Sequence, residues 1–122
     1  MGKEYFEITT RSEPHSHVVS LQGVLDAASE IKLSRTLDTL CQSECPHIVI
    51  DCDQLSYMNS ATFGLFFHYH RQCELHNGRL VLCRISPKIQ SILKLLGLHQ
   101  VLHVRSSIED ALQDVPAVES SG

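Results

Sequence analysis

One short run of β-branched residues limits most strongly how this chain can fold. Residues 47–52 read His-Ile-Val-Ile-Asp-Cys, with apolar side chains at consecutive positions. A strand with one buried face alternates apolar and polar residues, whereas a strand that is covered on both faces shows no such alternation. The run therefore predicts a strand at the centre of a sheet that carries further layers on both sides.

Helical and strand patterns alternate around this central strand. The spacing of apolar residues predicts helices over residues 27–41 and 60–76, and a third helix capped by Ser86 that ends at Gly97. A last helix is expected from Ser107, a hydroxyl residue followed closely by acids. Further strands are expected at residues 5–10, 17–22, 79–85 and 100–105, with a turn at 11–14. The predicted fold class is α/β, with a mixed sheet of about five strands and about four helices.

Length and charge restrict the domain organisation and the possible partners. The 122 residues suit one domain, which we expect to span residues 1–115, followed by a flexible tail over 116–122. Ten Lys and Arg against fourteen Asp and Glu give a net charge of −4, so nucleic acid is not expected as a partner. No apolar run approaches the roughly 18–20 residues of a membrane-spanning helix, so no membrane insertion is expected. The acidic N-terminus differs from a signal peptide and indicates a cytoplasmic protein.

Cysteine and histidine spacing does not favour a metal site or a disulfide framework. Five cysteines are an odd number, which fits reduced thiols. Cys41, Cys45 and His47 match no common zinc spacing, and no second pair of ligands follows them. His68 and His70 stand two positions apart in an expected helix and would point to different faces. We therefore expect no metal and no cofactor.

Two enzyme-like or signalling alternatives lack their supporting residues. A receiver domain would use Asp51 as its phosphoacceptor, but the first strand has no acidic pair for magnesium and the last strand region has no compensating lysine. A serine hydrolase would use Ser60, but no G-x-S-x-G sequence surrounds it and no ordered histidine and acid accompany it. Catalysis is therefore not expected. Asp51 and Asp53 are interpreted as turn-forming acids at the end of a strand.

Three separated motifs resemble those of one known family. Residues 59–64 read Asn-Ser-Ala-Thr-Phe-Gly, residues 21–26 read Leu-Gln-Gly-Val-Leu-Asp, and residues 86–98 begin Ser-Pro-Lys-Ile and end Leu-Gly-Leu. They are similar to the D-S-S-G-L-G, hydrophobic-x-G-x-L-D and S-P-x-V-x-x-x-L-x-x-x-G-L motifs of the STAS domain in single-domain anti-sigma factor antagonists. The likeness covers about residues 4–114. Asn59 stands in place of the usual aspartate, and Ala61 and Thr62 stand in place of serine and glycine.

The resemblance implies a partner switch controlled by phosphorylation. In such proteins the serine that matches Ser60 is phosphorylated by an anti-sigma factor that is also a serine kinase, with a histidine-kinase-like ATPase fold. A PP2C-type phosphatase reverses the modification, and the unmodified protein binds the kinase. The implied partner-binding residues are Asp26, Asn59, Ser60, Ala61, Thr62 and Gly64, with Thr62 as a less favoured second phosphoacceptor.

Physical chemistry supports Ser60 independently but leaves an alternative open. A phosphate at a helix N-terminus faces free N–H groups and the positive end of the dipole, so the modified protein can stay folded. The same charge in a contact surface opposes binding. Ser60 could instead be only a helix cap, as Asp26 is expected to be for the first long helix. Because Thr62 departs from the motif, a docking subunit of a lipid-transport ATP-binding cassette system is the alternative function.

Overall fold

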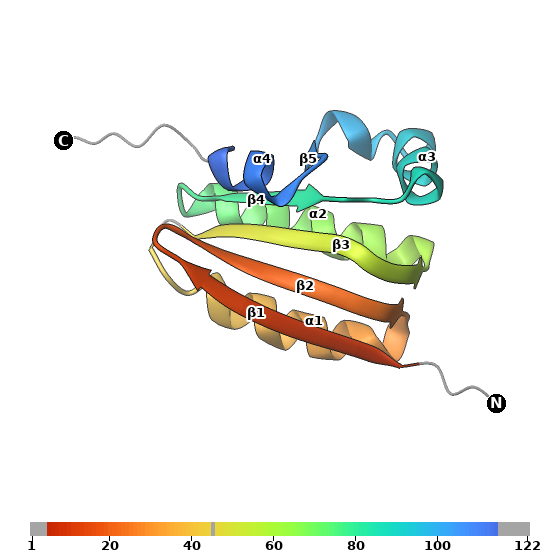
Figure 1. Ribbon diagram of the computed structural model, residues 1–122, viewed down its shortest axis with the longest axis horizontal. Helices are drawn as coiled ribbons and strands as arrows, with labels where there is room; N and C mark the ends of the chain where they lie inside the picture. The colour runs from red at the N-terminus through yellow and green to blue at the C-terminus, as the bar shows by residue number, and fades with distance from the viewer. Residues whose placement is uncertain (1–4, 45, 115–122) are drawn as a thin grey trace.

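A five-stranded mixed sheet forms the framework of the computed structural model, which describes residues 5–44 and 46–114 (Figure 1). β1 and β2 form an antiparallel hairpin, and all later neighbours are parallel. The strands lie in chain order: β1 (Phe6–Glu13), β2 (Ser16–Leu25), β3 (His47–Met58), β4 (Arg79–Cys83) and β5 (His103–Arg105). The predicted α/β class with five strands and four helices is confirmed, and β3 lies at the centre of the sheet.

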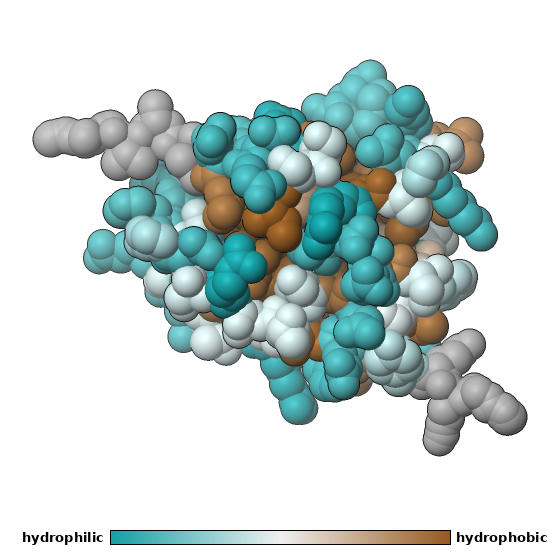
Figure 2. Space-filling model, viewed as in Figure 1, coloured by the Kyte–Doolittle hydropathy of each residue, from teal (hydrophilic) through white to brown (hydrophobic). Residues whose placement is uncertain are grey.

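The helices cover the two faces of the sheet unequally. In Figure 1, α1 (Ala27–Leu40) and α2 (Ser60–Leu75) run behind the sheet, whereas α4 (Ile108–Gln113) lies in front of β4 and β5. α3 (Pro87–Leu95) and the short 3-10 helix η1 (Leu98–Gln100) connect β4 to β5. Figure 2 shows the front face, where apolar residues gather near the centre beside α4 and polar residues surround them.

The side chains of β3 explain why its sequence lacks alternation. Ile48 and Ile50 belong to the large core that α1, α2 and α3 cover, whereas Val49 belongs to a smaller cluster that includes Ala111 of α4. All three β3 side chains are at most 2% exposed. The middle strand is thus packed on both faces, as its sequence predicts.

Several predicted boundaries are wrong, and each error has a local cause. β1 continues to Glu13, so the expected turn at 11–14 is confined to Pro14 and His15. β3 continues to Met58 through a polar stretch because its partner β2 extends alongside it, with Leu25 opposite Met58. The last strand is shorter than residues 100–105 because η1 occupies the approach to it.

The caps of α3 and α4 and the end of α3 agree with the sequence. The Ser86 hydroxyl oxygen accepts the Ile89 N–H at 3.2 Å, with Pro87 at the first helical position. The Ser107 hydroxyl oxygen accepts the Asp110 N–H at 3.0 Å. Gly97 follows α3 with a φ of 75°, a left-handed conformation that favours glycine.

The domain prediction extends beyond the described part of the chain. Residues 1–4 and the tail predicted at 116–122 lie outside the described residues, as does residue 115. Among the described residues, every helix is too short or too polar to span a lipid bilayer.

Candidate functional site

The carboxyl ends of β2 and β3 bring two of the sequence motifs together. The two strands are parallel, with Val24 opposite Tyr57 and Leu25 opposite Met58. Directly after this pair, the Asn59 N–H approaches the Leu25 carbonyl oxygen at 3.4 Å. The end of the motif at residues 21–26 and the start of the motif at residues 59–64 are therefore neighbours. They lie at the edge where parallel α/β sheets commonly place functional groups.

Asp26 caps α1, as the sequence predicts. Its Oδ1 accepts the Ser29 N–H at 3.1 Å and the Ser29 hydroxyl at 3.0 Å. The backbone hydrogen bond from Ser29, together with that from its hydroxyl, lowers the pKa of the Asp26 carboxyl below its ordinary value. The group is therefore a carboxylate at neutral pH and adds a negative charge at this end of the sheet.

Asn59, not Ser60, caps α2, which corrects the alternative reading of Ser60 as the cap. The Asn59 side-chain oxygen accepts the Thr62 N–H at 3.2 Å, and its backbone is extended, with φ −86° and ψ 166°. Asparagine caps as well as aspartate does, so the departure from the family motif removes a charge but keeps the acceptor. Ser60 becomes the first residue of the helix and is exposed.

Ser60, Ala61 and Gly64 form an exposed strip on the first turns of α2. A Cβ added at Gly64 would meet nothing within 4 Å, and Gly64 does not have a positive φ. Packing inside the molecule therefore does not require glycine at this position. The strip instead leaves the start of α2 flat, which allows another molecule to approach its backbone closely.

Thr62 lies inside the molecule, which corrects the expectation that its side chain belongs to the contact surface. The residue is 0% exposed. Its Oγ1 lies 2.9 Å from Glu30 Oε2 and 3.0 Å from Asn59 Oδ1, so the single hydroxyl proton is shared between two acceptors. A buried hydroxyl in this position is inaccessible to a kinase unless the first turn of α2 opens.

Sequence reasoning missed three residues of α1 and β3, the two elements that meet the start of α2. Glu30 lies in the first turn of α1 and accepts a hydrogen bond from the Thr62 hydroxyl. The one sequence signal for it was its position four residues after the capping residue Asp26. Ile31 of α1 is 61% exposed, and Tyr57 near the end of β3 is 51% exposed.

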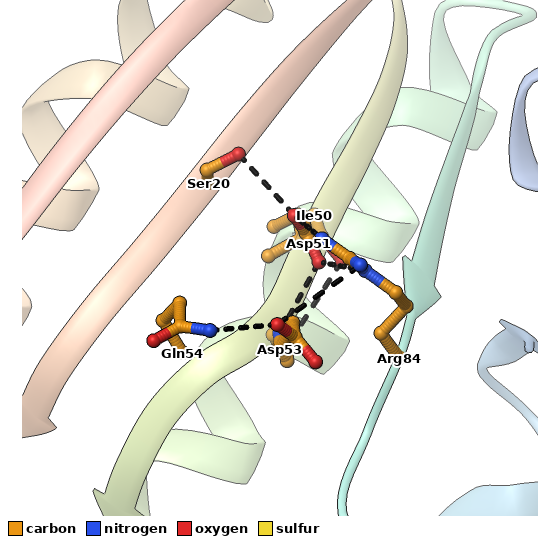
Figure 3. A network of polar contacts seen from close by, with 7 residues as sticks. Ser20, Ile50, Asp51, Asp53, Gln54 and Arg84 are labelled. Carbon is orange, nitrogen blue, oxygen red and sulfur yellow. Dashed lines mark hydrogen bonds and ion pairs between the residues drawn. The ribbon is translucent and has the colours of Figure 1, made fainter. Parts of the chain in front are cut away.

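A second polar group lies on the opposite face of the sheet, in the middle of β3 (Figure 3). Asp51, interpreted from the sequence as a turn residue, is 6% exposed and lies within the strand. Arg84 donates to it twice, from Nε to Oδ1 at 3.0 Å and from a terminal nitrogen to Oδ2 at 2.8 Å. The Asp53 N–H donates to Asp51 Oδ1 at 3.2 Å, and the Ser20 hydroxyl lies 3.5 Å from Oδ2.

This network satisfies a buried charge and has a structural role. Burial by itself raises the pKa of Asp51, but the hydrogen bonds from Arg84 and from the Asp53 N–H outweigh it and leave the pKa below its ordinary value. Arg84 has a φ of 56°, which is uncommon for a residue other than glycine. Its two bonds to Asp51 stabilise this conformation directly after β4.

The fold and this arrangement define a class of small α/β domains in which the start of a helix lies exposed beside two strand ends. Within that class, the chain belongs to the STAS domain family, whose model matches residues 5–111. Its sequence is 24% identical over 102 residues to the anti-sigma F factor antagonist of Paenibacillus polymyxa, covering 83% of this chain and 87% of that protein. The resemblance inferred from the motifs is thus confirmed.

Solved structures share the fold over most of their length. An anti-sigma factor antagonist from Mycobacterium paratuberculosis superposes with a TM-score of 0.80 and 17% identity, covering 89% of this chain and 92% of that one. The unphosphorylated form of the anti-sigma factor antagonist SpoIIAA gives a TM-score of 0.72 and 24% identity, over 88% of this chain and 94% of that one. The phosphorylated form of the Bacillus protein SpoIIAA gives a TM-score of 0.67 and 22% identity, with 89% and 97% covered.

Proposed function

We propose that this protein is an anti-sigma factor antagonist that works by partner switching. Unmodified, it binds an anti-sigma factor through the surface around the start of α2, and phosphorylation of Ser60 releases that partner. The observation that carries the proposal is the exposed Ser60 hydroxyl at the first position of α2, beside the carboxyl end of β2. The antagonist named above, which aligns over most of both chains, supports the same function.

The local chemistry explains how a phosphate could switch binding without unfolding the protein. The first turn of α2 contains no acidic side chain, and its backbone N–H groups favour an added negative charge. A phosphoserine carries about −1.5 to −2 charges at pH 7. The capping carboxylate of Asp26 already lies at this end of the sheet, so the surface would become strongly anionic. A partner that buries the unmodified surface would have to desolvate that charge.

The contact surface consists of the exposed strip and its neighbours. Asp26 and Asn59 are half-buried caps at its edge, and Ile31 and Tyr57 supply apolar area. Thr62 contributes by holding the turn from inside. The proposed residues are Asp26, Ile31, Tyr57, Asn59, Ser60, Ala61 and Gly64.

The proposed partner is an anti-sigma factor that is also a serine kinase of the histidine-kinase-like ATPase fold, with a PP2C-type phosphatase to reverse the reaction. The protein itself acts by binding and not by catalysis. Relatives named as antagonists favour this function over that of a docking subunit for a lipid-transport ATP-binding cassette system.

The test compares Ser60 variants in binding and phosphorylation assays with the cognate anti-sigma factor. Ser60→Ala should bind and accept no phosphate, as measured by intact mass after incubation with ATP. Ser60→Asp should fold normally and bind more weakly, though less weakly than the phosphorylated protein, because one carboxylate carries less charge. Ser43→Asp is a matched control, because Ser43 is exposed and lies before β3, at the opposite end of the sheet. Phosphate mapped to Thr62, or equal binding by the wild type and Ser60→Asp, would overturn the proposal.

A further inference from the structure

A group of three possible metal ligands lies at the far end of α2 from Ser60. His70 and Glu74 are four residues apart on α2 and therefore share one face of the helix. His103 comes from β5, and its ring lies 5.5 Å from that of His70, centroid to centroid. One ligand atom from each of the three side chains lies within 4.8 Å of the other two. His103 Nε2 and Glu74 Oε2 are 3.4 Å apart.

His70 is the member of this group that most needs a partner. The residue is only 9% exposed, and its buried Nδ1 has no hydrogen-bond partner within residues 5–44 and 46–114. An unpaired buried polar atom costs free energy.

We propose that His70, Glu74 and His103 bind one divalent cation of the zinc class. Two imidazoles and one carboxylate suit Zn²⁺ and similar transition metals, whereas Mg²⁺ and Ca²⁺ prefer oxygen ligands. Ligand bonds of about 2.0–2.1 Å in a tetrahedral array place the ligand atoms roughly 3.4 Å apart. The pair formed by His103 and Glu74 already has this spacing, at 3.4 Å.

The remaining adjustment is small, and it falls on the side chains that are free to move. The Glu74 side chain is 45% exposed and the His103 side chain 27% exposed, so both can turn toward His70. A shallow hollow of about 240 Å³, lined by His70, Arg71, Glu74 and Leu75, leaves room for a water molecule as a fourth ligand. Arg71 opposes the cation, and the Glu74 carboxylate offsets that charge.

A bound cation would join the end of α2 to the edge strand β5. These two elements are separated in sequence by β4 and α3, and β5 is only three residues long. His70 lies about 15 Å along the helix axis from Ser60, because each helical residue advances the axis by about 1.5 Å. The site would therefore stabilise the fold without touching the proposed phosphorylation site, and its test does not depend on the proposed function.

The experiment titrates zinc chloride into the full-length, metal-free protein and follows the heat of binding and the melting temperature. We expect one equivalent to bind and to raise the melting temperature. Glu74→Gln and His103→Ala should each weaken binding by about tenfold or more, since even residues that only support a metal ligand commonly have effects of this size. His76→Ala is the matched control, because His76 is an exposed histidine at the end of the same helix.

Cobalt(II) in place of zinc separates this site from binding by the cysteines. The expected visible spectrum is that of nitrogen and oxygen ligation, without a thiolate charge-transfer band. Failure to bind one equivalent, unchanged affinity in both Glu74→Gln and His103→Ala, or a thiolate band would each overturn the proposal. Loss of affinity in His76→Ala equal to that in His103→Ala would also overturn it, because the binding would then be nonspecific.

Discussion

The Thr62 hydroxyl lies 2.9 Å from Glu30 Oε2 and joins the first turn of α2 to the first turn of α1. Thr62 is also where the chain departs from the glycine of the family motif. Because the threonine is buried, its polar atom must find an acceptor inside the protein, and Glu30 supplies one. The threonine that replaces the motif glycine is thus hydrogen-bonded within the fold, and the exposed strip beside it keeps its shape.

Replacing Thr62 with valine tests this connection. Thr62→Val keeps the volume and leaves the Glu30 carboxylate without its donor, so we expect a loss of about 1–2 kcal/mol in the free energy of unfolding. Thr39→Val is the matched control, because Thr39 is exposed and its hydroxyl bonds to the Arg35 carbonyl oxygen within the same helix. Urea denaturation measures both. Equal effects of the two substitutions would contradict the proposed importance of the Thr62 contact.

The charge at position 59 provides a second test. Asn59→Asp restores the residue of the family motif and keeps the cap, but it places a carboxylate beside the same hydroxyl that Glu30 Oε2 already accepts. Repulsion between the two carboxylates should offset the gain from the helix dipole, so we expect Asn59→Asp to be less stable than the wild type by about 0.5–1 kcal/mol. Adding Glu30→Gln should recover the loss. A double-mutant cycle by urea denaturation at pH 7 checks this coupling, which would be absent if the two side chains were independent.

A substitution at Gly64 should affect the stability of the protein and its binding to a partner in opposite directions. Gly64→Ala fills open space on a helix and should raise the free energy of unfolding by about 0.5–1 kcal/mol. If a partner approaches the start of α2 closely, the added methyl group should nevertheless weaken binding. Thermal unfolding and a binding titration with the anti-sigma factor measure the two effects. Stronger or unchanged binding would show that the partner does not cover Gly64.

Gly23, in the motif at residues 21–26, should respond to substitution in the opposite way to Gly64. Its φ is +102°, and an added Cβ would overlap the Tyr5 carbonyl oxygen. Gly23→Ala therefore requires movement of the backbone at Tyr5, directly before β1, and should destabilise the protein by about 1–3 kcal/mol. Chemical denaturation of Gly23→Ala beside Gly64→Ala tests the contrast. The same sign for both would contradict it.

The ion pair of Asp51 and Arg84 should make the free energy of unfolding depend on pH in the acidic range. The pKa of Asp51 is lower in the folded protein than in the unfolded chain, so its contribution is complete above the unfolded value of about 3.9. The contribution is lost as the pH falls through the folded pKa. Asp51→Asn should cost about 2–3 kcal/mol at pH 7, because Arg84 loses a charged acceptor. The difference from the wild type should shrink between about pH 5 and pH 2, as followed by urea denaturation. A difference that is constant over this range would exclude the ion pair as its source.

Local sequence was sufficient for the elements and for the family. The unbroken apolar run at Ile48 to Ile50 required a strand with two packed faces, and capping residues such as Ser86 and Ser107 placed two helix starts correctly. These features depend on a residue and its near neighbours. A capping side chain bonds to an N–H two or three residues along the chain, and the apolar pattern of a strand shows which of its faces are buried. The motifs likewise located the turn that carries Ser60.

Only the tertiary structure decided which atoms meet across the sheet and the helices. Thr62 was known as a hydroxyl in a turn, but its burial against Glu30 depends on where β2 and β3 end side by side. Asp51 was classed as a turn residue because its partner, Arg84, directly follows the next strand and is not apparent from the local sequence. Sequence spacing describes contacts along one element. Contacts between elements depend on strand register and helix placement, which are determined by the packing of the whole core.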